Sequence, residues 1–177
     1  ALGQDQVDNL ATLIVLGLRE EDSSPFSSNP VSIPEPESSG ILPVEQIRKA
    51  ILNGNLIARG KNFKKGRLSA NDDFEQTVNF SIKLFIDFFI RIRGAVETNG
   101  NYWKRTTKDE KGVALRTNFI CGCILLLDRF IEEASKGRDL PHHQISQSIE
   151  KYIAELIIGI ENMDATQRKI LFAWNKN

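Results

Sequence analysis

Apolar residues recur every three or four positions along most of this chain, which is the spacing of one face of an α-helix. The pattern is strongest over residues 72–96, where Phe80, Leu84 and Phe88 widen the apolar surface beyond a single stripe. We expect this helix to be central and to be contacted from two sides. The predicted helices cover residues 4–18, 43–52, 72–96, 113–134 and 143–160, followed by a short helix that Asp164 caps.

Residues 20–40 interrupt this pattern with four prolines among many serines, at positions 25, 30, 34 and 36. Proline at that density excludes helix, so the segment is expected to be extended, with a short strand over 31–33. Its Phe26 is expected to make an anchoring contact. Residues 54–71 contain glycines and cations without apolar periodicity, and they are predicted to form a loop.

The predicted fold class is mainly all-α: a helical bundle of about five to six helices with a proline-rich extended segment near the N-terminus. The predicted division is an N-terminal helix and extended arm over residues 1–42, followed by a helical bundle domain over residues 43–177.

Charge, apolar runs and cysteine content indicate which kinds of partner and which cell compartment to expect. Lys and Arg together number 23, and so do Asp and Glu, so the net charge is zero and only a local patch could attract nucleic acid. The most apolar run carries Lys83, Asp87 and two arginines, which argues against a membrane span. The cysteines, Cys121 and Cys123, diverge around the predicted helix and favour a reducing, cytoplasmic compartment. The chain begins without Met or a secretory signal, as a processed product or a fragment of a longer protein would.

No motif for nucleophilic catalysis, nucleotide binding or metal binding is present, so no cofactor and no metal site are predicted. Arg138 and His143, with four residues between them, resemble the arginine–histidine signature of HEPN-type ribonucleases, in which the pair meets across a helical dimer. This enzyme is the alternative prediction. Pro141 breaks the helical turn between the two residues, so a connection between helices with a capping role is the structural interpretation that we favour.

Two basic segments are the better candidates for function. Residues 59–67 contain five cations and no acid, and residues 102–116 combine Tyr102 and Trp103 with further cations. Such loops can neutralise phosphates, and exposed aromatic rings can stack on unpaired bases. The competing interpretation is solubilising surface charge, with Trp103 packed on the bundle. The predicted nucleic-acid contacts are Arg59, Lys61, Lys64, Lys65, Arg67, Lys104 and Arg105.

A family resemblance adds a biological setting. Ser24-Pro25-Phe26 follows an acidic stretch after the first predicted helix, and Ser39-Gly40-Ile41-Leu42 leads into the next. A long aromatic helix and the turn Asn101-Tyr102-Trp103-Lys104 come later. This order resembles the later, helical part of DGQHR-domain proteins, and the name-giving D-G-Q-H-R sequence is not in the chain.

The resemblance implies a component of a bacterial DNA-modification or defence system, including regulators of DNA phosphorothioation. It carries no catalytic residue to this chain. The leading prediction is therefore a non-enzymatic helical domain that contributes DNA binding or assembly, by self-association or with other defence and modification proteins. A pure protein-interaction module, docking through the proline-rich segment, is the remaining alternative.

Overall fold

The computed structural model describes residues 2–27, 44–69, 73–98, 100, 103 and 117–168. In this part of the chain five helices and one small sheet form: α1 (Gln4–Glu20), α2 (Val44–Leu52), β1 (Ala58–Arg59), β2 (Lys64–Lys65), α3 (Phe74–Glu97), α4 (Thr117–Ser135) and α5 (His142–Glu161). Residues 165–168 add one further helical turn. The mainly helical bundle predicted from the sequence is confirmed.

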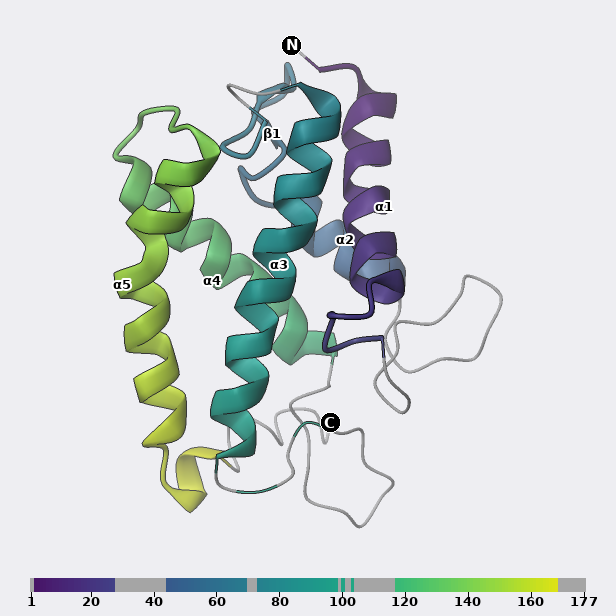
Figure 1. Ribbon diagram of the computed structural model, residues 1–177. Coiled ribbons are helices and arrows are strands. Elements are labelled where there is room, and N and C mark those ends of the chain that lie inside the picture. The colour runs from purple at the N-terminus through teal and green to yellow at the C-terminus, as the bar shows by residue number, and fades with distance from the viewer. Residues whose placement is uncertain are drawn as a thin grey trace.

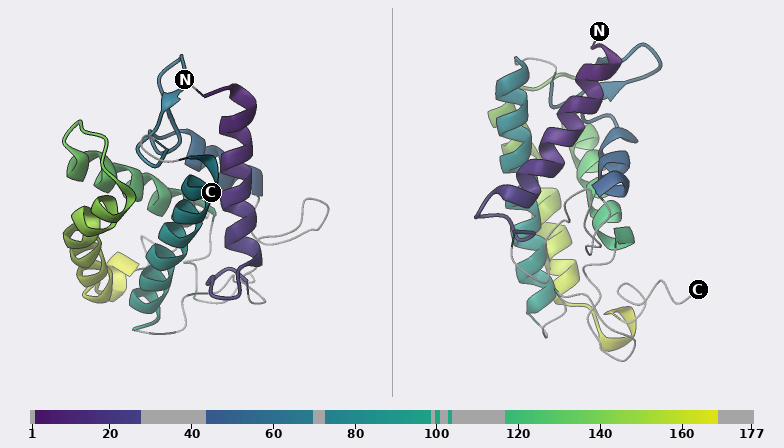
Figure 2. Two further views of the ribbon diagram at one scale, coloured as in Figure 1. Left: turned by 45° about the horizontal axis from the view of Figure 1, so that its top comes forward. Right: turned by 90° about the vertical axis from the view of Figure 1, so that its right-hand side faces the viewer.

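The helices form two layers around one core. Helices α1, α3 and α5 stand side by side in the layer facing the viewer of Figure 1, and α2 and α4 lie behind them. The side view in Figure 2 separates the two layers. Contacts run from α1 to α3, from α3 to α5, from α5 to α4, from α4 to α2 and from α2 back to α1. This closed order lets every helix bury an apolar face against two neighbours.

Helix α3 occupies the centre of the front layer, as its broad apolar surface predicted. Asp73 caps its start, accepting the backbone N–H of Gln76 at 2.8 Å. Phe85 and Phe89 are fully buried, and Phe88 is 1% exposed. Burying each such ring stabilises the fold by roughly 1.5–3 kcal/mol relative to leaving it in water.

Helix α1, the N-terminal helix predicted within residues 1–42, contributes to this core. It packs on α2 and α3, and Leu10, Ala11 and Ile14 are almost completely buried. Gly17 allows the close approach to α3, because a Cβ there would lie 2.5 Å from Cδ1 of Ile82. Residues 28–43, which contain most of the proline-rich segment, lie outside the described residues.

The segment after α1 is fastened by Ser24-Pro25-Phe26. The Ser24 hydroxyl donates to the carbonyl of Leu18 at 2.5 Å and accepts the Phe26 N–H at 3.2 Å. The Phe26 ring is completely buried, with its centroid 5.0 Å from that of Phe89 and 5.6 Å from that of Trp103. The expected anchoring contact of Phe26 is therefore confirmed.

The helix boundaries differ from the predicted ones by a few residues where they can be compared. Helix α1 continues to Glu20, and α5 begins at His142, one residue before the predicted start. Asp164 does cap the final turn, since its carboxylate accepts the Gln167 N–H at 2.8 Å. The predicted loop over 54–71 contains an antiparallel hairpin that the sequence pattern did not reveal, with Ala58 opposite Lys65 and Arg59 opposite Lys64.

Candidate nucleic-acid interface

The five cations of the basic segment 59–67 fall into two groups. Arg59 and Arg67 form ion pairs with acidic residues of the same chain, whereas Lys61, Lys64 and Lys65 are exposed and have no such partner among the described residues. No ion pair involves any of these three lysines in the part of the chain that the structure describes. We call residues 58–65, which comprise β1, its turn and β2, the hairpin. The hairpin thus presents three positive charges to solvent without a counter-charge of its own.

Arg67 is the buried member of the segment, with only 7% of its side chain exposed. Its guanidinium meets the Glu132 carboxylate with two bonds, Nε to Oε1 at 2.9 Å and Nη2 to Oε2 at 3.2 Å. Nη1 also bonds Asp139 Oδ1 at 2.9 Å and the Arg138 carbonyl at 3.1 Å. The Glu132 hydrogen bond, chiefly, raises the pKa of Arg67 further above its usual value. Arg67 therefore links the hairpin segment to the region between α4 and α5.

Arg59 makes a second link to the same region. Its Nη2 lies 3.1 Å from Asp139 Oδ1, and its Nε donates to the carbonyl of Lys65 at 2.8 Å. Arg59 also stands opposite Lys64 in the sheet, where like charges repel. Asp139 neutralises one of the two charges, which permits this pairing.

Backbone and ring contacts complete the attachment of the segment. Gly66 passes so close to Leu56 and Ile57 that a Cβ would overlap their backbone, and its N–H donates to the Ile57 carbonyl at 2.7 Å. His142 lies at the start of α5, and its Nε2 is 2.6 Å from the Leu68 carbonyl. Its ring stacks on Phe80 of α3, with centroids 3.9 Å apart. The basic segment is therefore held between α3, α4 and α5.

A buried carboxylate supports the beginning of the segment. Asp128 of α4 is 7% exposed, and its Oδ1 accepts the Asn55 N–H at 2.9 Å. Gly54 leaves room for it, because a Cβ there would lie 2.6 Å from the carboxyl carbon. Burial raises the pKa of Asp128, the Asn55 hydrogen bond opposes that rise, and the nearby Glu132 adds to it.

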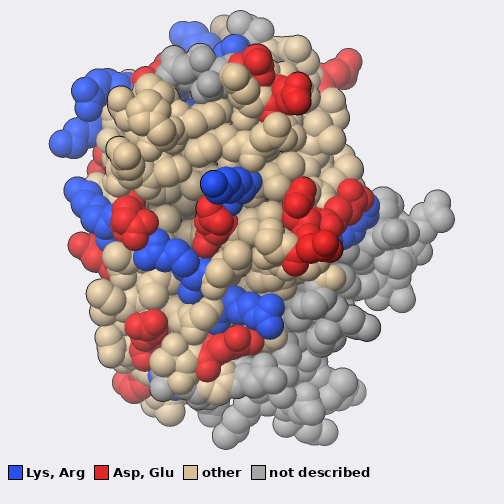
Figure 3. Space-filling model, viewed as in Figure 1, with Lys and Arg blue, Asp and Glu red and all other residues tan. Residues whose placement is uncertain are grey.

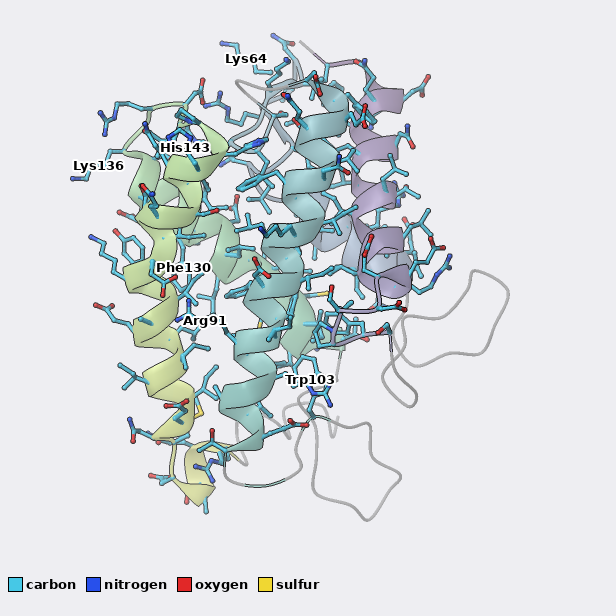
Figure 4. The ribbon with its side chains drawn as sticks, viewed as in Figure 1. Lys64, Arg91, Trp103, Phe130, Lys136 and His143 are labelled. Atoms are coloured by element: carbon cyan, nitrogen blue, oxygen red, sulfur yellow. The ribbon has the colours of Figure 1, made fainter. Side chains whose placement is uncertain are left out.

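The second basic segment is described only at Trp103, because Lys104 and Arg105 lie outside the described residues. Trp103 is 2% exposed, and its Nε1 donates to the Pro25 carbonyl at 3.4 Å. Its ring is packed into the core and is not available to stack on a base. Figure 4 places Trp103 in the lower half of the molecule and Lys64 at the top.

Arg138 and His143 do not share one helical turn. Arg138 lies in the α4–α5 connection, residues 136–141, and His143 in the first turn of α5. Pro141 precedes that helix in an extended conformation, with φ −59° and ψ 151°. Both side chains are exposed, and in the described structure no hydrogen bond joins them.

The charge of the molecule is unevenly distributed at the end that carries the hairpin. Figure 3 shows blue Lys and Arg atoms projecting at the top and upper left, with red Asp and Glu atoms to the right of the top. Asp5, Asp73 and Glu75 belong to the first turns or caps of α1 and α3, which begin at this end. Elsewhere on this face the two signs alternate. Although the total charge is zero, exposed lysines and arginines therefore gather beside the hairpin.

No helix of the described residues has both the length and the apolar character needed to cross a membrane. The same residues contain no group of three or more His, Cys, Asp or Glu side chains arranged to hold a metal ion. Comparisons of the chain with protein-family models, with curated proteins and with solved structures found no match.

Proposed function

We propose that this chain is a non-enzymatic helical domain that binds the phosphate backbone of DNA through the exposed lysines of the hairpin, Lys61, Lys64 and Lys65. The observation that supports this proposal is the contrast within one short segment. Its two arginines form ion pairs with Glu132 and Asp139 of the same chain. Its three lysines face solvent with no paired acid in the described structure.

Lysine is suited to this role as a compact charge on a flexible stem, because a phosphate presents a strong negative charge without requiring a planar fork. Contacts of this kind release counterions from the duplex and carry no sequence information by themselves. The buried position of Trp103 favours backbone contact over stacking on unpaired bases.

The resemblance to DGQHR-domain proteins supplies the setting of the proposal: a DNA-modification or defence system in a bacterial cytoplasm. Within such a system the domain would contribute DNA affinity to an assembly, by self-association or with other modification proteins. Base reading and chemistry would then belong to its partners.

The test is binding of fluorescein-labelled duplex DNA, followed by anisotropy at several salt concentrations. The wild-type chain is expected to bind, with an affinity that falls steeply as salt rises. Lys64→Glu together with Lys65→Glu should weaken binding at low salt by on the order of tenfold or more and reduce the salt slope by about two. Neither side chain holds the fold together, so thermal unfolding should be nearly unchanged.

A matched control separates local contact from net charge. Lys83→Glu with Lys151→Glu changes the total charge by the same amount at exposed positions of α3 and α5. It is expected to leave the salt slope close to that of the wild type. The proposal is wrong if the wild type does not bind duplex DNA at low salt, or if the hairpin variant and the control lose affinity equally.

A further inference from the structure

A second group of cations lies beside the hairpin, in a part of the sequence that the basic-segment pattern did not include. Lys136 and Arg138 belong to the α4–α5 connection, and both side chains are exposed. The described residues form no ion pair with either of them. They are separated from the hairpin lysines by more than seventy positions along the chain, so only the fold can bring the two groups together.

The contacts of Arg59 and Arg67 establish this proximity. Asp139 accepts both arginines, from Arg59 at 3.1 Å and from Arg67 at 2.9 Å. The carbonyl of Arg138 itself accepts Arg67 Nη1 at 3.1 Å. The ion pairs of Arg59 and Arg67 therefore join the two segments that carry the basic groups.

These ion pairs also occupy two carboxylates that lie next to the exposed cations. Asp139 and Glu132 are both bonded to the buried or half-buried arginines. The side chains of Lys136 and Arg138 are left facing solvent, like those of the hairpin lysines. Figure 4 shows Lys136 and His143 at the upper left and Lys64 at the top, at the same end of the bundle.

The backbone turns sharply at Lys136, where the chain leaves α4. Lys136 and Gly137 both adopt left-handed conformations, with φ of 48° and 77°. The Lys136 N–H still makes a helical hydrogen bond, to the Glu132 carbonyl at 3.2 Å, and the left-handed conformations then end α4. Left-handed residues at this place are a common way for a helix to end, so the sharp turn sets where the connection to α5 begins.

We infer that Lys136 and Arg138 form the second half of the proposed DNA-binding surface, so that a duplex contacts the hairpin and the α4–α5 connection together. The inference rests on the proposed function of the hairpin. It extends the contact from one short loop to two loops that come from opposite halves of the sequence and are locked to each other by Arg67. A rigid surface of this kind pays little ordering entropy when it binds.

Lys136→Gln with Arg138→Gln tests the inference, because it removes both charges and keeps side chains of comparable length. The Arg138 contact to Arg67 is made by its backbone carbonyl, so the internal ion pairs should survive the substitution. The salt slope for duplex DNA is expected to fall by about two relative to the wild type, and the affinity at low salt by several-fold or more. Lys83→Gln with Lys151→Gln is the matched control and should leave the slope unchanged.

The possible outcomes distinguish this inference from the function on which it rests. If the wild type binds DNA and only the hairpin variant lowers the slope, the hairpin proposal stands and the second half is refuted. If the wild type binds no DNA, both fail. Preferential binding to vesicles containing phosphatidylserine, with no salt-dependent binding to the duplex, would also overturn both, because the surface would then recognise a membrane.

Discussion

At the end of the bundle where α3 begins, charged groups join the hairpin to the α4–α5 connection, whereas towards its other end aromatic rings join the chain after α1 to α3. Arg67 fastens the first region with directional bonds to Glu132 and Asp139. Phe26 fastens the second by packing between Phe89 and Trp103. Both fastenings connect segments that are far apart in sequence.

The difference shows why only one of these regions can display charge. Apolar packing is non-directional and excludes water, so the aromatic region gains stability by hiding its side chains. Arg67 instead holds Glu132 and Asp139 with a few directional hydrogen bonds, and the neighbouring lysines can remain in water. The hairpin region can therefore be rigid and strongly basic at once.

The largest expected effect is in the aromatic region. Phe26→Ala should lower the free energy of unfolding by about 3–5 kcal/mol, because it removes a fully buried ring and leaves a cavity between two others. The loss should be nearly the same at low and high salt, as measured by urea denaturation. Phe74→Ala, at a ring that is 39% exposed, is the control and should cost about 1 kcal/mol or less. A similar cost for the two variants would contradict the anchoring role of Phe26.

Arg67→Lys should have a smaller effect, about 1–2 kcal/mol, because lysine keeps the charge and cannot reproduce the two-bond contact with Glu132. Hydrogen exchange should locate the loss in residues 55–69 and at the start of α5. Arg59→Lys is the matched control: 28% of its side chain is exposed, and an exposed pair contributes about 0–1 kcal/mol. If Arg67→Lys lowered the free energy of unfolding no more than Arg59→Lys does, the ion pairs of Arg67 would not be what holds the hairpin.

Asp128→Asn should produce the smallest change in the free energy of unfolding, and it should stabilise the protein at neutral pH, whereas the two preceding variants destabilise it. Burial raises the pKa of Asp128 in the folded protein, so the folded state binds its proton more tightly than the unfolded state does. The contribution of this carboxyl to stability is complete below its unfolded pKa, about 3.9, and is lost as the pH rises through the folded value. Asparagine keeps the acceptor for Asn55 without a charge.

Asp128→Asn is therefore expected to match the wild type near pH 4 and to be more stable by about 1 kcal/mol at pH 7. Thermal unfolding across that range measures the difference. A variant that is less stable than the wild type at neutral pH would show that the charged carboxylate, through its bond to Asn55, favours the fold.

The apolar spacing in the sequence predicted the helices to within a few residues. Apolar residues three or four positions apart lie on one face only if the chain is helical, and that face can then be buried. The central place of α3 was predictable for the same reason, because Phe80, Leu84 and Phe88 extend its apolar surface. The anchoring of Phe26 was also expected, as an aromatic ring in an otherwise polar stretch has little reason to remain in water. The hairpin was missed because its strands contain only two residues each and no alternating pattern.

The roles of the cations were decided by tertiary structure alone. In the sequence Lys64, Lys65 and Arg67 are equivalent members of one basic run, and nothing local distinguishes the lysines from the arginine that is buried. The partners of Arg67 lie 65 and 72 residues further along the chain, and Asp139 is also the partner of Arg59. A charged side chain forms an ion pair only if the fold brings an opposite charge within about 3 Å of it, and otherwise it faces solvent. The order of residues along the chain does not specify which distant groups come that close.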